Sequence, residues 1–258
     1  MSTFRLQHLI RGTLLSTALV ATAVQAQDYP PVIQSLEQQG VKVLESFEAP
    51  GGMTGYVGEM QGRSLAFYLT PDGNHVIVGT LLDEEGNNLS AASIQELIEG
   101  PKFAEAWPQL EDSHWVQDGS SDADTVVYTF TDPNCPYCYR FRQQAEPWIE
   151  AGKVQLRHIL VGILKEDSLT KAATILGSEN PEAALHDHQA SYQQGGIEVD
   201  RKLVSAAHMD VKANNRLMQE LGLRATPSTL YKDDDGNVVM VQGLPNPQAL
   251  KRMMGPKP

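Results

Sequence analysis

The chain has 258 residues, 41% of them hydrophobic and 20% charged, which is enough for one or two domains with a buried core. Its formal net charge of −12 argues against nucleic acid and anionic membrane surfaces as partners. Two cysteines in this length do not make a disulfide scaffold, and no stretch after the N-terminus is long and apolar enough to cross a bilayer.

Residues 1–26 have the pattern of a signal peptide. Arg5, His8 and Arg11 form a basic start, residues 14–24 are apolar or small, and the small residues before Gln27 resemble a cleavage site. A membrane anchor is the alternative, but an apolar run of 11 residues is short for it. Cleavage removes two arginines and no acid, so the mature chain carries −14 and enters an oxidising compartment.

Residues 27–88 predict a small α+β domain. The expected elements are a helix at 31–39 and strands at 41–48, 56–60, 65–69 and 75–81. The alternation from Leu65 to Leu69 predicts a half-buried strand, and residues 83–88 predict a solvated loop. A unit this small buries little surface alone, so we expect it to serve as a dimerisation domain.

Residues 89–108 predict a partly helical and therefore stiff linker. An apolar stripe runs along Ser90–Glu99, and Gly100–Pro101 is expected to break that helix. The helix is expected to resume at Lys102 and to stop before Pro108.

Residues 109–258 predict an α/β domain that contains a redox motif. A strand at 113–116 and a central strand at 125–130 precede Cys135-Pro136-Tyr137-Cys138, which opens a helix. Strand, turn, CxxC and helix is the order typical of a thioredoxin-type fold.

The position of Cys135 at a helix start favours its thiolate. With Cys135 as the N-cap and Pro136 as the first helical residue, the sulfur faces the free N–H groups of Tyr137 and Cys138. Both the amides and the helix dipole lower the pKa of Cys135, which makes it the nucleophile. This interpretation requires a sulfur that is ionised near neutral pH and that solvent can reach.

Cys138 lies one helical turn further on and is expected to be the buried, resolving thiol. It shares an apolar face with Phe141, Ala145 and Trp148. Arg140 and Arg142 are expected on exposed faces, and a later proline, Pro147, is expected to kink the helix near its end.

Three other interpretations of the cysteine pair compete with this one. A structural disulfide between residues i and i+3 closes too small a loop to stabilise the fold much. A zinc site needs about four ligands, and the sequence offers no second CxxC. The third interpretation is that the cysteines are two unrelated core residues, and the strand and turn before them argue against it.

The rest of the chain completes the domain. A strand at 154–163 is followed by a helical insertion at about 165–222, and a β-hairpin and a helix at 247–254 end the chain. His158 is expected to be a sheet residue only. His186 and His188 are two apart on a helix and do not share a face, which argues against a metal site. Thr226-Pro227 precedes a strand and is expected to be a cis peptide beside the CxxC, with a trans edge proline as the alternative.

Several blocks of sequence, in one order, resemble the DsbC/DsbG family of periplasmic thiol:disulfide interchange proteins. The blocks are Ala49–Met53, Tyr68–Gly73, Ser113–Trp115, Asp132–Cys138, Gly152–Arg157 and Val241–Pro245. The absence of a second cysteine pair favours the DsbG branch, because DsbC-type proteins carry an additional structural disulfide.

The resemblance implies a V-shaped homodimer in the periplasm, with a cystatin-like N-terminal dimerisation domain, linker arms and thioredoxin-like domains facing each other. It implies Cys135 as attacking thiol, Cys138 as resolving thiol, and substrate-positioning roles for Pro136, Tyr137, Thr226 and Pro227. It also implies an inner-membrane electron donor of the DsbD type and no cofactor or metal beyond the cysteine pair. Thioredoxins carry a buried acid six residues before the nucleophile, where this chain has Thr129.

The sequence therefore predicts a reductase or isomerase that acts on disulfides or sulfenylated cysteines of partly or fully folded exported proteins. The alternative is a dimeric holdase chaperone with little redox turnover, and a glutaredoxin-like enzyme is a third, weaker reading. Because the surface is acidic, we expect a cleft that favours folded partners over apolar unfolded ones. The direction of the reaction and the identity of the substrate are open at this point.

Overall fold

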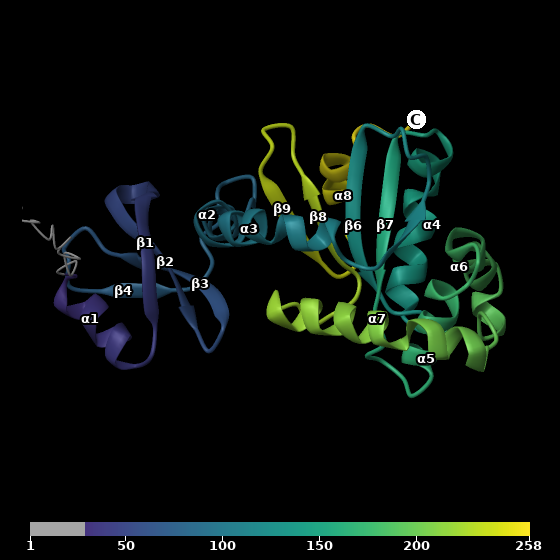
Figure 1. The fold of residues 1–258 in the computed structure, drawn as a ribbon. Coiled ribbons are helices and arrows are strands. Elements are labelled where there is room, and N and C mark those ends of the chain that lie inside the picture. Colours follow the sequence, from purple (N-terminus) through teal and green to yellow (C-terminus); the bar gives the residue numbers. More distant parts are fainter. Residues whose placement is uncertain (1–28) are drawn as a thin grey trace, which may run out of the picture.

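The computed structural model describes residues 29–258, so the predicted signal peptide at residues 1–26 lies outside the described residues. Figure 1 shows an N-terminal unit (residues 29–88) on the left and a C-terminal unit (residues 115–258) on the right, joined by a helical connection. Within the described residues, none of the helices combines the length and the apolar composition that crossing a bilayer would require.

The N-terminal unit packs one helix against an antiparallel sheet with strand order β1-β2-β3-β4. Its elements are α1 (Pro31–Gln38), β1 (Lys42–Ala49), β2 (Met53–Met60), β3 (Arg63–Leu69) and β4 (Val76–Val78). Helix α1 ends before Gly40, whose φ of 95° is a conformation that glycine adopts without steric penalty. The predicted helix and strands are all present, although β2 begins earlier and β4 is shorter than predicted.

Strand β3 is buried on both faces, so the prediction of a half-buried strand is wrong. Phe67 and Leu69 belong to the core beneath α1. Ala66 and Tyr68 point to the opposite face and pack with Ile98 of the helical connection. The alternation of residue types shows one apolar face but does not show that a distant helix covers the other.

The helical connection is continuous, so the predicted break at Gly100–Pro101 and the predicted stop before Pro108 are both wrong. It consists of α2 (Leu89–Ile94), a π-helical turn (Gln95–Glu99) and α3 (Gly100–Glu111), which includes Pro108. The Gly100 N–H donates to the Gln95 carbonyl, five residues back. This wider turn admits one extra residue just before Pro101, whose nitrogen cannot donate. The linker boundaries at 89 and 108 stay a prediction.

The C-terminal unit is built on a sheet of order β5-β7-β6-β8-β9 in which only β6 and β7 pair in parallel. The strands are β5 (Trp115–Asp118), β6 (Thr125–Thr131), β7 (Val154–Leu160), β8 (Ser228–Lys232) and β9 (Val238–Gln242). The helices are α4 (Pro136–Glu150), α5 (Ser168–Leu176), α6 (Pro181–Ala190), α7 (Arg201–Glu220) and α8 (Pro247–Met254). Helices α5 to α7 form an insertion between β7 and β8, where the sequence predicts one.

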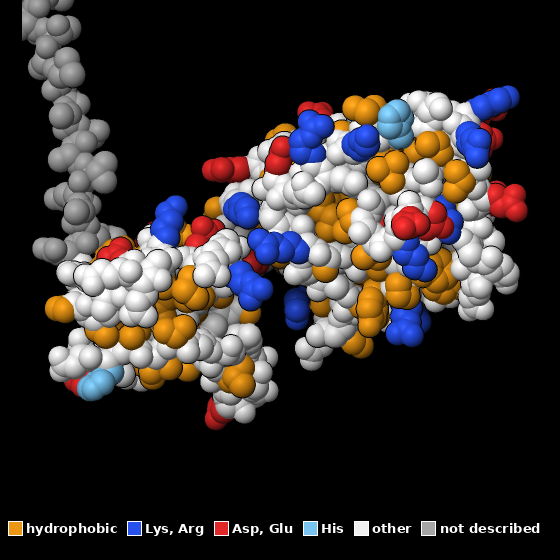
Figure 2. Space-filling model, turned by 90° about the horizontal axis from the view of Figure 1, so that it is seen from below, with side chains coloured by type: hydrophobic (Ala, Val, Ile, Leu, Met, Phe, Trp, Pro, Cys, Tyr) orange, Lys and Arg blue, Asp and Glu red, His pale blue; other side chains and the backbone are white. Residues whose placement is uncertain are grey.

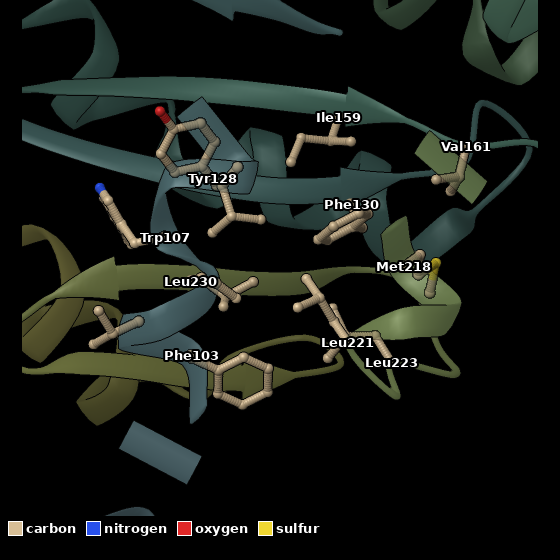
Figure 3. Close-up of a cluster of buried hydrophobic side chains, with 13 residues drawn as sticks. Phe103, Trp107, Tyr128, Phe130, Ile159, Val161, Met218, Leu221, Leu223 and Leu230 are labelled. Atoms are coloured by element: carbon tan, nitrogen blue, oxygen red, sulfur yellow. The ribbon is translucent and has the colours of Figure 1, made fainter. Parts of the chain in front are cut away.

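Helices cover both faces of this sheet. Val127 of β6 packs with α4 and α8 on one face. Tyr128 and Phe130 point to the other face, where Figure 3 shows them among Trp107 of α3 and Met218 of α7. The arrangement confirms the predicted thioredoxin-like fold with a helical insertion, preceded by a small α+β unit. A central strand whose last five residues, 127–131, are buried therefore leads directly into the turn that carries the cysteines.

Candidate active site

Cys135 caps helix α4, and Pro136 is its first residue, as the sequence predicts. The Cys138 N–H donates to the Cys135 sulfur at 3.3 Å. Proline fits here because its missing N–H falls where a helix has no internal acceptor for one. The local sequence thus places one sulfur against the free amides at the positive end of a helix.

Cys135 is an acidic thiol in this environment. Its pKa is lowered to about 6, and the largest cause is a hydrogen bond from the Cys138 thiol. Burial opposes that effect, while Thr226 and the amides of Cys138 and Tyr137 lower the pKa further. The amides predicted from the sequence are therefore only part of the cause, and the Cys138 thiol and Thr226 lower the pKa of Cys135 as well.

Cys138 has the opposite electrostatic environment. It is 3% exposed, and Phe141, Ala145 and Trp148 on the same face of α4 are buried with it. Burial is the main reason that its pKa is raised well above the usual value, and the hydrogen bond to Cys135 and its charge add to the rise. Both cysteines are free thiols. Of the two, Cys135 ionises readily and Cys138 retains its proton.

The Thr226–Pro227 peptide is cis and lies against the cysteine pair. The Cys135 sulfur is 3.2 Å from the Thr226 carbonyl oxygen, to which the thiol form donates. The Thr226 hydroxyl is buried without a partner among the described residues. It is thus free to donate to the sulfur once Cys135 loses its proton. Pro227 is anchored from the other side, where its carbonyl accepts from the Gly243 N–H at 2.7 Å.

The sequence predicts a Cys135 sulfur that solvent can reach, and this prediction is wrong for the folded chain. Cys135 is only 2% exposed, whereas Tyr137 beside it is 52% exposed. Pro136 is exposed as well. The two residues between the cysteines therefore form the surface that a partner meets first, and the sulfur lies directly below it.

The turn before Cys135 is held by a buried carboxylate that the sequence analysis missed. Asp132 accepts from the Ile163 and Leu164 N–H groups at 2.7 and 2.9 Å. It also accepts from the Ser168 hydroxyl and the Asn134 N–H, both at 2.8 Å. Four donors satisfy the charge of this 1% exposed side chain. The Asp-Pro-Asn turn in the sequence was the available signal for it.

The helical insertion also contacts this turn. His188 of α6 donates from Nε2 to the Pro133 carbonyl at 2.9 Å and accepts the Ile197 N–H on Nδ1 at 3.1 Å. Both bonds fit a neutral ring, and burial lowers the pKa of His188. The Tyr192 hydroxyl donates to the Asn134 carbonyl at 3.3 Å. The insertion therefore supports the backbone that presents Cys135.

A buried charge cluster joins β5, α4, β7 and α6. Asp118 is fully buried, lies 2.9 Å from both Arg142 Nε and His186 Nε2, and is 3.5 Å from His158 Nε2. Burial alone would raise the pKa of Asp118, but His158 and Arg142 together hold it well below its usual range. The expectation of an exposed Arg142 is wrong, because its side chain is 13% exposed.

His158 is more than the sheet residue that the sequence predicts. Its Nδ1 lies 3.0 Å from the Thr131 hydroxyl, and its other nitrogen faces Asp118. His186 contacts Asp118 while His188 contacts Pro133, so the two histidines lie in different environments. Between residues 29 and 258, no group of three His, Cys, Asp or Glu side chains has a metal-binding arrangement.

Thr129 occupies the position six residues before the nucleophile. It is fully buried, and its hydroxyl has no hydrogen-bond partner among the described residues. A hydroxyl cannot accept a proton as a carboxylate would. The buried carboxylate of Asp118 contacts Arg142 and His186 instead, so it does not replace the missing acid beside the cysteines.

Comparisons with known proteins agree with this geometry. A model of the disulfide bond isomerase protein N-terminal domain matches residues 20–91, and a model of a thioredoxin-like domain matches residues 118–255. Among solved structures, a linker-deletion mutant of Proteus mirabilis ScsC has a TM-score of 0.51 and 22% identity, with coverage of 64% of this chain and 83% of that one. At that identity the likeness shows the fold alone.

Two curated relatives are much more similar. The thiol:disulfide interchange protein DsbG of Pseudomonas aeruginosa is 43% identical, and the match covers 95% of each chain. DsbG of Escherichia coli is 40% identical over 95% of this chain and 98% of its own, while E. coli DsbC is 23% identical over 95% of both. With its acidic N-capping cysteine, buried second cysteine and adjacent cis-proline, the chain belongs to the DsbG family of thiol:disulfide interchange proteins.

Proposed function

We propose that this protein is a periplasmic thiol–disulfide reductase and isomerase that works through Cys135 and Cys138. The observation that carries the proposal is the pKa of Cys135, lowered to about 6, beside a second thiol whose pKa is raised. At neutral pH the first sulfur is an anion and the second keeps its proton. This division suits one nucleophile and one resolving group.

The exchange begins when the Cys135 thiolate attacks one sulfur of a substrate disulfide. A mixed disulfide forms, and the other substrate sulfur leaves as a thiolate that takes up a proton. A sulfenylated cysteine reacts in the same way and releases water. Forming the mixed disulfide removes the negative charge of Cys135, which is one of the causes of the raised pKa of Cys138. Cys138 therefore becomes easier to deprotonate at the step where it has to act.

The second step has two outcomes. If the Cys138 thiolate attacks the Cys135 sulfur, the substrate leaves as a thiol and the protein keeps a Cys135–Cys138 disulfide. The substrate has then gained two electrons, and the protein needs an external donor before it can react again. If another substrate thiolate attacks first, the substrate leaves with a rearranged disulfide and the protein returns to its reduced state.

Thr226, Pro227, Pro136 and Tyr137 position the substrate in this proposal. The Thr226 carbonyl lies 3.2 Å from the sulfur, so a segment that pairs with this loop brings its own sulfur to Cys135. Because Cys135 is 2% exposed, the contact between this loop and the start of α4 has to open for the attack. The exposed ring of Tyr137 offers apolar surface beside that opening.

The family supports further partners for this chain. We assign it a homodimer, formed through the N-terminal unit, and exported proteins with disulfides or oxidised cysteines as substrates. A DsbD-type inner-membrane protein supplies the electrons, and no cofactor is required beyond the cysteine pair. The exposed Ile77 and Val78 on the edge strand β4 support the dimer, because an apolar sheet edge is a surface that pairs readily.

Replacing each cysteine tests the roles assigned to them. Cys135→Ser is expected to abolish reduction of a substrate disulfide, because serine is neither ionised at neutral pH nor able to form a disulfide. Cys138→Ser is expected to retain the first step and to accumulate the mixed disulfide, which mass spectrometry detects. Undiminished reductase activity in Cys135→Ser would refute the proposal, and Cys138→Ser serves as its matched control.

A further inference from the structure

A second site lies in a groove of about 490 Å³ between the two units. One wall is the β2–β3 hairpin at residues 62–64, where β3 begins, and another is the helical connection at Glu99, Lys102 and Phe103. The segment 221–224 before the cis-proline and two residues of β9 complete it. The groove shares no lining residue with the cavity around Cys135 and Cys138.

Three cations line this groove without being neutralised. Arg63, Lys102 and Arg224 are exposed, and none of them forms an ion pair with another residue of the described chain. Glu99 is the carboxylate that also faces the groove; burial raises its pKa, and the charge of Lys102 opposes that rise. The groove therefore carries an excess of positive charge in a protein whose net charge is −12.

The cations come from both units and meet at the groove. A Cβ added to Gly62 would lie 4.0 Å from the Arg224 guanidinium, and Gly62 is the neighbour of Arg63. A Cβ added to Gly222 would lie 3.4 Å from Lys102 Nζ. Figure 2 shows Lys and Arg side chains gathered on this face where the two units adjoin. Like charges brought together repel one another, so an anion that bound among them would be favoured.

The groove is adjacent in sequence to the redox site. Arg224 stands two residues before Thr226, whose carbonyl contacts the Cys135 sulfur. An extended chain advances about 3.3 Å per residue. A substrate segment that pairs with the Thr226 loop would therefore place residues two to four positions from its cysteine near Arg224.

We propose that this groove binds an acidic segment of the substrate polypeptide, two to four residues from the cysteine that reacts with Cys135. The proposal rests on the proposed function and names a substrate class for it: proteins whose reactive cysteine is flanked by aspartate or glutamate. Within one protomer, the groove beside the redox loop is basic although the chain as a whole is acidic.

The negative charge of the whole protein does not cancel this preference at physiological salt. Screening limits interactions between exposed charges to about 8 Å at 0.15 M ionic strength. A carboxylate seated among the three cations is within that distance of them, whereas Glu99 is the one acidic residue among those that line the groove. The preference should therefore be local, and it should weaken as salt is added.

Two matched peptides test the proposal. Each carries one cysteine in a mixed disulfide with thionitrobenzoate, and three residues beside it are either aspartate or asparagine. A single turnover with the reduced, full-length protein releases thionitrobenzoate, which is followed by absorbance. We expect the aspartate peptide to react about fivefold faster at 0.15 M salt and at nearly the same rate as the asparagine peptide at 1 M salt.

Substitutions in the groove locate the effect. Arg224→Glu and Arg63→Glu are each expected to bring the ratio of the two rates to one or below. Lys257→Glu makes the same charge change at an exposed position outside the groove and is expected to leave the ratio unchanged. A ratio near one in the wild type, or a ratio that Arg224→Glu leaves unaltered, overturns the proposal.

A binding measurement separates this proposal from the proposed function. Fluorescence polarisation of the same peptides with serine in place of cysteine reports binding without any exchange. Tighter binding of the aspartate peptide, lost in Arg224→Glu, supports the groove even if neither cysteine peptide reacts, and in that case only the exchange chemistry fails. Binding of inorganic phosphate without any preference between the peptides overturns the assignment to a polypeptide segment.

Discussion

At the scale of single residues, the reactivity of this protein follows from the hydrogen bonds around one sulfur. The Cys138 thiol and two helix amides hold the pKa of Cys135 at about 6. Alkylation of Cys135 by iodoacetamide is expected to accelerate from pH 5 to pH 7 with a midpoint near 6 and to level off above it. Quantifying the modified peptide by mass spectrometry at each pH checks this.

The same lowered pKa links the reduced state to stability. A thiol in an unfolded chain has a pKa of about 8.5. The stabilisation of the folded thiolate is therefore complete above pH 8.5 and is lost as the pH falls to about 6. The free energy of unfolding of the reduced protein, relative to that of Cys135→Ser, should therefore increase as the pH rises from about 6 to about 8.5. A midpoint of alkylation above pH 8 would contradict both expectations.

Asp118 is the residue whose loss should destabilise the fold most specifically. Asp118→Asn removes the charge that pairs with Arg142 and His158, and breaking a buried pair costs roughly 3 kcal/mol. Because the folded pKa is lowered, the stabilisation is present above the unfolded value of about 3.9 and is lost as the pH falls below it. Urea unfolding should thus show a large difference at pH 7 that narrows at pH 3.

The exposed Asp187 provides a control for that measurement. Asp187→Asn is expected to change the free energy of unfolding by less than about 0.5 kcal/mol. If both substitutions changed the free energy of unfolding equally at pH 7, the cluster around Asp118 would contribute no more to stability than an exposed carboxylate does.

At the scale of elements, the cysteine turn is held by the insertion as well as by its own helix. The loop after β7 approaches α5 so closely that a Cβ on Gly162 would clash with the Leu169 backbone. Helix α5 starts at Ser168, which donates to Asp132 in the cysteine turn. Any side chain at position 162 would therefore push away helix α5, which supports the active site.

Gly162→Ala is expected to lower the free energy of unfolding by about 2 kcal/mol and to broaden the pH dependence of Cys135 alkylation. Gly79→Ala is the matched control, because a Cβ there meets no atom within 4 Å. Thermal unfolding of both variants, with alkylation profiles, checks the expectation. An unchanged midpoint of thermal unfolding for Gly162→Ala would contradict the expectation, because it would show that the loop can move away from α5 at no cost.

The elements that the sequence predicts correctly are those determined by neighbours in the chain. The cap at Cys135 and the buried face of Cys138 and Phe141 depend on residues within two helical turns, so local patterns reveal them. The ties from Asp118 to Arg142 and His186 span 24 and 68 residues. No local pattern encodes such pairs, because they form only after the sheet and the insertion have packed together.

At the scale of the whole molecule, the distribution of charge matters more than its total. A net charge of −12 describes the chain as a whole as acidic, yet the groove between the units presents Arg63, Lys102 and Arg224. The sum over a sequence gives no positions, and Arg224 lies more than a hundred residues along the chain from both Arg63 and Lys102. Only the folded chain shows which side chains share a surface.

The π-helical turn at Gln95–Glu99 has a mechanical consequence. Ile94 just before the turn and Ile98 within it pack in the N-terminal unit, and Phe103 after it is anchored in the C-terminal core. The extra residue in this turn therefore helps to set the angle between the N-terminal and the C-terminal unit. Deleting Glu96 should restore an ordinary helical turn and thereby change the angle at which the two units meet. Small-angle X-ray scattering should then show an altered shape for the deletion variant, while Glu96→Ala should keep the wild-type shape. Identical scattering curves for the deletion variant and the wild type would show that this turn does not determine the angle between the units.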